Sequence, residues 1–227
     1  MIIVPARDEQ ETVGNVILDL LLEGARIGKV LSVLVIDDNS RDRTAERASA
    51  AGARVVQNRG SGLASAFRTG VDEALGLGAE IIVQVDADGQ YCAADLGTLL
   101  TLCATGADLA IGDRTWRRPP GMPLLRYLLN RSASRTLSAV LRTSLADTQS
   151  GFRAFTADVA VRCRITGNYT YTHEQLIAAV RQGFAISFVP VNFYVRRAGK
   201  SRLMTSACNY IVCTVPHICR VLMRSRD

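Results

Sequence analysis

The sequence predicts an α/β fold in which helices cover a mostly parallel β-sheet. Three observations support this prediction: apolar runs of strand length alternate with amphipathic runs of helical length, short loops join them, and some apolar runs have no polar face. Strands without a polar face are typical of parallel sheets buried on both sides. The 227 residues, 48% apolar and 21% charged, fit one globular domain.

The first predicted strand spans residues 2–4 and is closed by Pro5. A helix over residues 9–22 follows, with Gly24 as its stop, and its apolar face comprises Val13, Val16, Ile17, Leu20 and Leu21. Residues 30–36 form the second predicted strand, continuously apolar, and residues 37–40 the turn after it.

The next elements continue the alternation. We expect a helix over residues 43–51, a strand over 54–57, a helix after the glycines at 60–62, a strand over 81–85, a helix over 95–104 and a strand over 108–111. From Gly112 the pattern changes to a proline-rich loop, a helix over 124–141, a turn and short strand within 147–155, a helix over 172–182 and an extended segment over 186–195. Residues 1–203 are therefore expected to form one domain.

Residues 204–227 form an amphipathic C-terminal segment. A helix over 206–224 would align Asn209, His217, Arg220 and Arg224 in one polar stripe among apolar residues. Such a helix fits a membrane interface, with arginines toward anionic headgroups, or a helix docked on a core or in a dimer. We expect residues 204–227 to form a membrane-interface helix, with the docked helix as the alternative.

Composition narrows the class of partner. The net charge of +6 and the pI near 9.2 indicate anionic partners. Aromatic residues do not interleave the arginine groups as a base-stacking surface requires, so we expect no nucleic acid partner. The six cysteines form no CxxC pair, which favours reduced thiols in the cytoplasm. No apolar run reaches the length of about 18 residues that predicts a membrane span.

Acidic residues follow three predicted strands. Asp8 and Glu9 come after the first, Asp37 and Asp38 after the second, and Asp86 and Asp88 after the strand over 81–85. Parallel strands present their carboxyl ends at one sheet edge, where ligands bind. Asp86 and Asp88, with Gln90 nearby, predict a Mg²⁺ or Mn²⁺ site, since such ions prefer hard oxygen ligands. The alternative is a set of solvated acidic turns.

Dinucleotide and P-loop folds are excluded by the glycine pattern. The first strand-to-helix turn reads Pro5-Ala6-Arg7-Asp8-Glu9 and lacks GxGxxG, and the chain has no P-loop.

The ordered motifs resemble those of family 2 glycosyltransferases with the GT-A fold, which is Rossmann-like. They are Val4 to Gln10, Val35 to Ser40 with Asp42 and Thr44, Asn58 to Gly60 with Gly62, Val85 to Gln90, and Asp147 to Arg153. The run Arg197 to Leu203 resembles the polyprenol (dolichol) phosphate mannose synthase branch. One departure is that Arg7 and Asp8 replace the Tyr and Asn of the usual PAYNE motif.

The resemblance implies a nucleotide-sugar site and a divalent cation. The residues implied in donor binding are Pro5, Ala6, Glu9, Asp37, Asp38, Asp86, Ala87 and Asp88. Asp88 would be the direct metal ligand, assisted by Asp86 and Gln90, and the Mg²⁺ or Mn²⁺ ion would neutralise the diphosphate leaving group.

The acceptor determines which further groups are needed. A prenyl phosphate is already largely anionic at pH 7, because the second pKa of a phosphate monoester is about 6, and so needs cations for placement more than a base. Candidate acceptor residues are Arg114, Arg126, Arg131, Ser150, Arg153, Arg197, Lys200 and Arg202. A hydroxyl acceptor would need a base, for which Asp147 and Glu174 are candidates.

The leading hypothesis is an inverting, metal-dependent transferase. It would move a hexose, with mannose from GDP-mannose as the expected donor sugar, to a polyprenyl phosphate, as a peripheral protein at the cytoplasmic membrane face. An integral-membrane partner subunit or a homodimer is compatible with this hypothesis. The alternatives are a family 2 enzyme acting on a hydroxyl of a glycan or natural product, and a non-catalytic nucleotide-binding protein.

Overall fold

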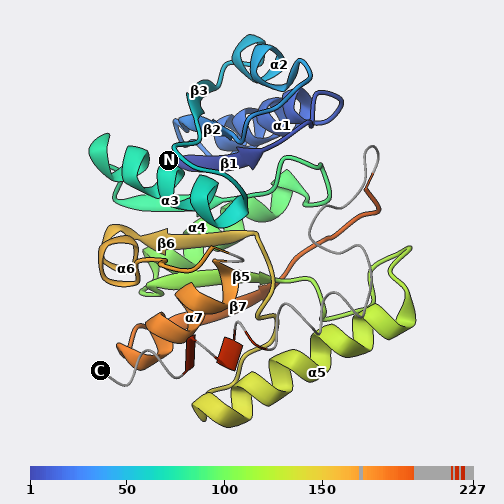
Figure 1. The fold of residues 1–227 in the computed structure, drawn as a ribbon, viewed down its shortest axis with the longest axis vertical. Helices are drawn as coiled ribbons and strands as arrows, with labels where there is room; N and C mark the ends of the chain where they lie inside the picture. The colour runs from blue at the N-terminus through green and yellow to red at the C-terminus, as the bar shows by residue number, and fades with distance from the viewer. Residues whose placement is uncertain (169–170, 197–215, 217, 220, 223–227) are drawn as a thin grey trace.

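The structure is a computed structural model that describes residues 1–168, 171–196, 216, 218, 219, 221 and 222. Within these residues, a seven-stranded sheet has the order β3-β2-β1-β4-β6-β5-β7 (Figure 1). The strands are β1 (Ile2–Ala6), β2 (Val33–Asp37), β3 (Arg54–Gln57), β4 (Ile81–Gln84), β5 (Leu109–Asp113), β6 (Arg153–Thr156) and β7 (Ile186–Pro190). The sheet is mostly parallel and flanked by helices, so the predicted fold class is confirmed.

Helices pack on both faces of the sheet and close two apolar cores. One core contains residues of α1 (Val13–Arg26), α2 (Thr44–Ala50) and α4 (Leu96–Ala104), which follows the short η1 (Ala93–Asp95). The other contains residues of α3 (Leu63–Gly76), α5 (Leu124–Leu141), α6 (Ala157–Arg162) and α7 (Thr172–Arg181). In β1, Ile3 belongs to the second core while Ile2 and Val4 belong to the first. This alternation explains why the strands read as continuous apolar runs.

Strand β6 runs antiparallel between β4 and β5. Arg153 at its start pairs with Gln84 at the end of β4 and with Ile111 of β5. An antiparallel strand begins at the edge where its neighbours end. The loop over residues 147–152 therefore lies at the edge that carries the ends of β4 and β5.

Some element boundaries differ from those predicted. The first helix begins at Val13, because the backbone nitrogens of Thr12 and Val13 both donate to the Glu9 carbonyl in a turn. The helix passes Gly24 and ends before Gly28, whose φ of 68° suits glycine.

Gly24 has a packing role instead of a stop role, since a Cβ there would lie 2.5 Å from Leu31 Cδ1. The second strand begins at Val33, and Val30 is exposed. Helix α6 was not predicted; it is only six residues long, and Thr156 caps it by accepting from the Val159 nitrogen at 3.3 Å.

The predicted C-terminal helix lies mostly outside the described residues, including its polar stripe at Asn209 and Arg224. The described residues 216, 218, 219, 221 and 222 are helical. Ile218, Val221 and Leu222 pack against the core that contains α7, and Arg181 Nη2 donates to the Leu222 carbonyl at 2.8 Å. These three side chains match the core-docking alternative. Among the described helices, none combines the length and hydropathy needed to span a membrane.

Candidate active site

Asp86 and Asp88 lie at the carboxyl edge of the sheet, just after β4, and each residue as a whole is partly exposed. Strands β1 and β2 are parallel to β4 and end at the same edge. The turns after these three strands therefore meet there, as the acidic pattern predicts.

Asp86 is enclosed on two sides. Gln84 Nε2 donates to Asp86 Oδ1 at 3.1 Å. On the other side lies Gly151, where a Cβ would be 2.7 Å from Asp86 Oδ2. The Gly151 nitrogen donates to the Tyr91 hydroxyl at 2.8 Å, which fixes this backbone in place. Burial is the main cause that raises the pKa of Asp86 above its ordinary value.

Asp88 lies between the β4 turn and the segment that follows β7. The Gln90 nitrogen donates to Asp88 Oδ1 at 3.1 Å, and Arg196 Nη1 lies 3.8 Å from Asp88 Oδ2. Arg196 also forms an ion pair with Glu9, so one guanidinium bridges two of the acidic turns. Burial, followed by the charge of Asp86, raises the pKa of Asp88 to about 6. Burial also raises the pKa of Glu9.

Residues 191–196 return across the sheet edge and carry Arg196 to this position. The Tyr194 nitrogen donates to the Gln90 carbonyl, and Gln90 Nε2 donates to the Tyr194 carbonyl, both at 2.8 Å. Gln90 was predicted to be a metal ligand, and its side-chain nitrogen instead holds the segment over residues 191–196 in place.

The predicted donor residues after β2 shape their own loops. Asp38 accepts from Asn58 Nδ2 at 2.6 Å and from the Gly62 nitrogen at 3.0 Å, and Asp37 accepts from the Ser40 nitrogen at 3.3 Å. These bonds hold the loop before α3 against the end of β2. The remaining predicted donor residues, Pro5, Ala6 and Ala87, are buried at the ends of β1 and β4.

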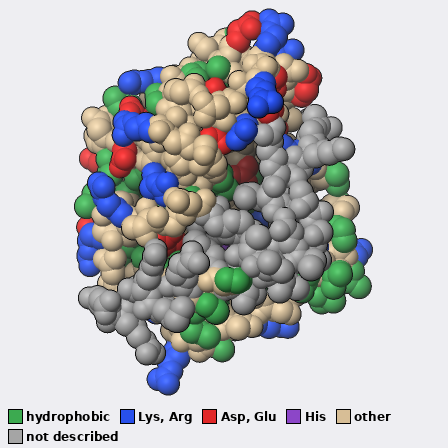
Figure 2. All heavy atoms as spheres, in the orientation of Figure 1, with side chains coloured by type: hydrophobic (Ala, Val, Ile, Leu, Met, Phe, Trp, Pro, Cys, Tyr) green, Lys and Arg blue, Asp and Glu red, His purple; other side chains and the backbone are tan. Residues whose placement is uncertain are grey.

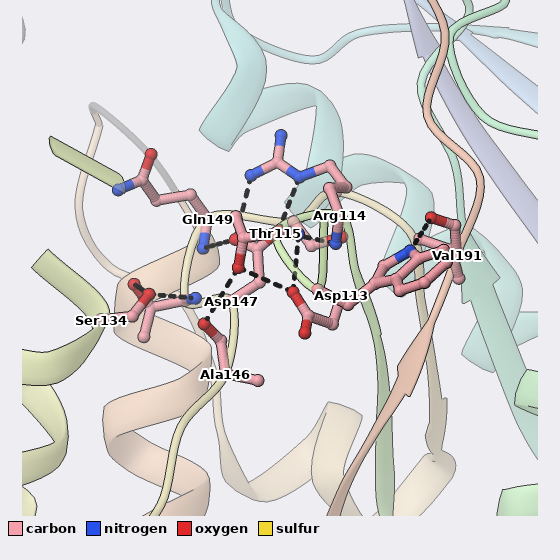
Figure 3. A network of polar contacts seen from close by, with 12 residues as sticks. Asp113, Arg114, Thr115, Ser134, Ala146, Asp147, Gln149 and Val191 are labelled. Atoms are coloured by element: carbon pink, nitrogen blue, oxygen red, sulfur yellow. Dashed lines mark hydrogen bonds and ion pairs between the residues drawn. The ribbon is translucent and has the colours of Figure 1, made fainter. Parts of the chain in front are cut away.

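Arg114 and Asp147 form a buried ion pair that joins the end of β5 to the loop before β6 (Figure 3). Arg114 Nε donates to Asp147 Oδ2 at 2.7 Å and Nη2 donates to Oδ1 at 3.0 Å. Two backbone nitrogens, of Arg114 and Gln149, also donate to this carboxylate. Burial acts to raise the pKa of Asp147, but the Arg114 charge outweighs it, so the pKa lies below its ordinary value.

The geometry does not support Asp147 or Glu174 as a general base. Asp147 is ionised and bonded to Arg114 through both oxygens, which weakens its attraction for a proton. Glu174 is buried on α7 and accepts from the Thr166 nitrogen at 2.7 Å and the Gly167 nitrogen at 3.0 Å. Both carboxylates hold backbone segments in place.

Arg153 was predicted to contact an acceptor phosphate, and its position corrects that prediction. Its side chain is 0% exposed and donates to the carbonyls of Ser150 at 2.7 Å, Thr172 at 2.8 Å and Thr148 at 3.2 Å. Arg153 therefore supports the loop from inside. Ser150 is also buried, with its hydroxyl 3.4 Å from that of Tyr91.

Two of the other candidate acceptor cations, Arg126 and Arg131, lie on α5. Arg131 is partly exposed and donates to the Thr115 carbonyl at 3.1 Å and to the Tyr127 hydroxyl at 3.0 Å. Arg126 is partly exposed on the same helix. Arg197, Lys200 and Arg202 lie outside the described residues.

Several contributors to the site were not among the predicted site residues: Gln84, Tyr91, Gly151, Arg196 and Tyr171, whose hydroxyl donates to Gln84 Oε1. A glutamine inside an otherwise apolar strand is a signal that could have identified Gln84, because a buried amide needs polar partners. The roles of Gly151 and Tyr171 depend on contacts between distant segments, which no local pattern indicates.

Comparisons with known proteins agree on one family. A model described as glycosyl transferase family 2 matches residues 1–162. Glycosyltransferase AglJ of Haloferax volcanii is 34% identical over 87% of this chain, which spans 64% of that relative. A polyprenol monophosphomannose synthase of Mycolicibacterium smegmatis is 30% identical over 91% of this chain and 81% of its own length.

The fold also matches solved structures. Glucosyl-3-phosphoglycerate synthase from Mycobacterium tuberculosis, solved with Mn²⁺, uridine diphosphate and phosphoglyceric acid, gives a TM-score of 0.76 at 20% identity. The match covers 98% of this chain and 76% of that one. At this identity the likeness concerns the fold.

Proposed function

This chain belongs to glycosyl transferase family 2, and we propose that it transfers a hexose from a nucleotide sugar to a polyprenyl phosphate. The choice of a phosphate acceptor depends on one observation, which concerns the hydrogen bonds of the two candidate bases. Asp147 and Glu174 are both held by protein donors, which fits a nucleophile that is anionic before it reacts. A relative named as a polyprenol monophosphomannose synthase supports the same acceptor. We propose mannose from GDP-mannose as the donor, as the resemblance of Arg197 to Leu203 implies.

The nucleotide-sugar donor would bind at the carboxyl edge of the sheet, where the acidic turns after β1, β2 and β4 meet. In this proposal the nucleoside rests on the loops after β1 and β2, near Pro5, Ala6 and Glu9, with the bonds of Asp37 and Asp38 fixing the loop shape. The diphosphate then reaches the ends of β4. Arg196, already placed between Glu9 and Asp88, can turn to a diphosphate oxygen once a divalent ion neutralises Asp88.

The carboxylate oxygens of Asp86 and Asp88 are suitable ligands for a divalent ion. Within the described part of the chain no third His, Cys, Asp or Glu completes a cluster. Two carboxylates suit Mg²⁺ or Mn²⁺ that takes its remaining ligands from water and substrate phosphates. The lack of a side chain at Gly151 lets the Asp86 carboxylate lie against that backbone, because a Cβ there would be 2.7 Å from Asp86 Oδ2. When bound, such an ion would supply charge neutralisation for the leaving diphosphate.

On the acceptor side the chain supplies cations. Arg126 and Arg131 on α5 would place the prenyl phosphate, with Arg197, Lys200 and Arg202 as the further cations that the sequence predicts. Arg114 acts through its pair with Asp147, which fixes the loop next to Asp86.

A peripheral position at the cytoplasmic membrane face is also part of the proposal. Leu124, Leu125 and Leu128 at the start of α5 are 55%, 62% and 50% exposed. Figure 2 shows hydrophobic side chains gathered at the lower right, over this part of α5. Exposed apolar groups beside basic residues suit an anionic lipid surface, which would also deliver a lipid acceptor.

The test is a transfer assay with Mn²⁺ or Mg²⁺, a panel of nucleotide sugars, and two acceptors of equal chain length, a polyprenyl phosphate and the polyprenol. We expect product with the phosphate alone and none from the Asp88→Asn variant. Transfer to the polyprenol, or to a glycan hydroxyl in place of the phosphate, would contradict the acceptor assignment. Nucleotide binding without any transfer would favour a non-catalytic protein.

A further inference from the structure

Gln84 is a polar residue in the centre of the sheet. Its side chain is 0% exposed in β4, between β1 and β6. A buried amide needs partners for both its oxygen and its nitrogen. Nε2 donates to Asp86 Oδ1 at 3.1 Å, and Oε1 accepts from the Tyr171 hydroxyl. The amide therefore links Tyr171 to the carboxylate at the end of β4.

The order of donors and acceptors fixes the orientation of this amide. An ionised carboxylate only accepts hydrogen bonds, so Asp86 requires the NH₂ end of Gln84. The oxygen end must then face Tyr171, whose hydroxyl supplies a proton to it. If the hydroxyl were removed, the amide could rotate and present its oxygen to Asp86, where two acceptors would repel each other.

Tyr171 is itself held rigidly. It is 0% exposed directly before α7, and its ring stacks on Phe67 of α3 with centroids 4.1 Å apart and planes 3° apart. The hydroxyl position is thus set by the packing of two helices against the sheet. Packing of the core therefore keeps the Tyr171 hydroxyl in contact with Gln84.

We propose that Tyr171, acting through Gln84, is a positioning residue that sets the rotamer of Asp86 for the donor diphosphate and its divalent ion. Gln84 holds one carboxylate oxygen while the Gly151 backbone limits the space beside the other. The inference rests on the proposed function, because it assigns Asp86 to that donor site. Neither Tyr171 nor Gln84 needs to touch the substrate.

The test measures how much Mn²⁺ improves the binding of GDP, by calorimetry with and without the metal. In Tyr171→Phe and in Gln84→Met we expect this improvement to fall about tenfold, with metal-free GDP affinity unchanged. Tyr171 and Gln84 belong to one series of hydrogen bonds that ends at Asp86. The double variant should therefore lose no more of the Mn²⁺ effect than either single variant. Ile177→Val, on α7 and also 0% exposed, is the control for a general loss of core packing and should keep the full improvement.

The outcomes separate this inference from the proposed function. An unchanged Mn²⁺ effect in either folded variant, or no Mn²⁺ effect in the wild type, would overturn the positioning role. Gln84→Met carries the test if Tyr171→Phe does not fold. Transfer to polyprenyl phosphate is measured separately, so a wild type that responds to Mn²⁺ as expected but transfers nothing would refute the function and leave the positioning role supported.

Discussion

Replacing Asp147 by alanine should destabilise the protein strongly. The carboxylate side chain is 1% exposed and the Arg114 side chain 9% exposed, and the substitution leaves that guanidinium buried without its ion-pair partner. Removing one partner of a buried pair costs about 3–5 kcal/mol. For a chain of this size, that corresponds to a fall of roughly 6–20 °C in Tm.

Urea unfolding followed by circular dichroism at pH 7 measures the free energy of unfolding. The matched control is Asp158→Ala, which breaks the exposed Arg162–Asp158 pair on α6, with side chains 50% and 59% exposed. Exposed pairs contribute about 0–1 kcal/mol, so this control should unfold almost as the wild type does. If Asp147→Ala lost no more than its control, the reasoning from burial would be refuted.

The Arg114–Asp147 ion pair also predicts that the free energy of unfolding depends on pH. Burial opposes ionisation of Asp147, but Arg114 lowers its pKa below the unfolded value. The stabilisation is therefore complete above the unfolded pKa of about 4 and is lost as the pH falls through the lower folded pKa. The difference in unfolding free energy between wild type and Asp147→Ala should be constant above about pH 4 and shrink below it.

Three further predictions concern the site and the membrane face. Gly151→Ala places a Cβ 2.7 Å from Asp86 Oδ2, so calorimetry should show Mn²⁺-dependent nucleotide binding weakened about tenfold in a folded protein, and unchanged binding would contradict this geometry. The folded state raises the pKa of Asp88 to about 6, so its ionised carboxylate destabilises the metal-free protein at pH 7. Thermal unfolding of metal-free Asp88→Asn should therefore show a free energy of unfolding about 1–3 kcal/mol higher than that of the wild type, and the variant should lose transfer activity. Leu125→Glu should reduce co-sedimentation with anionic vesicles about tenfold, whereas Val140→Glu, at the other end of α5 and 56% exposed, should not.

The sequence was sufficient to predict the fold class and the position of the acidic edge. Strands such as β2 are apolar on both faces because helices cover both sides, and the apolar run reports this directly. Parallel strands end at one edge, so Asp38 and Asp86 could be placed together from the order of elements. Boundaries were less certain, since Gly24 can end a helix or pack against Leu31 inside one, and a local pattern does not distinguish these roles.

The tertiary structure decided what each charged group does. Whether a carboxylate is a base, a ligand or a structural anchor depends on its burial and partners, and the partner of Asp147 is 33 residues away in the sequence. Arg153 resembles a surface cation in sequence but lies in the core, because β6 inserts antiparallel between β4 and β5. The sequence by itself determined which residues reach the sheet edge, through strand direction and period. The packing of distant segments determined which of them remain accessible to a ligand.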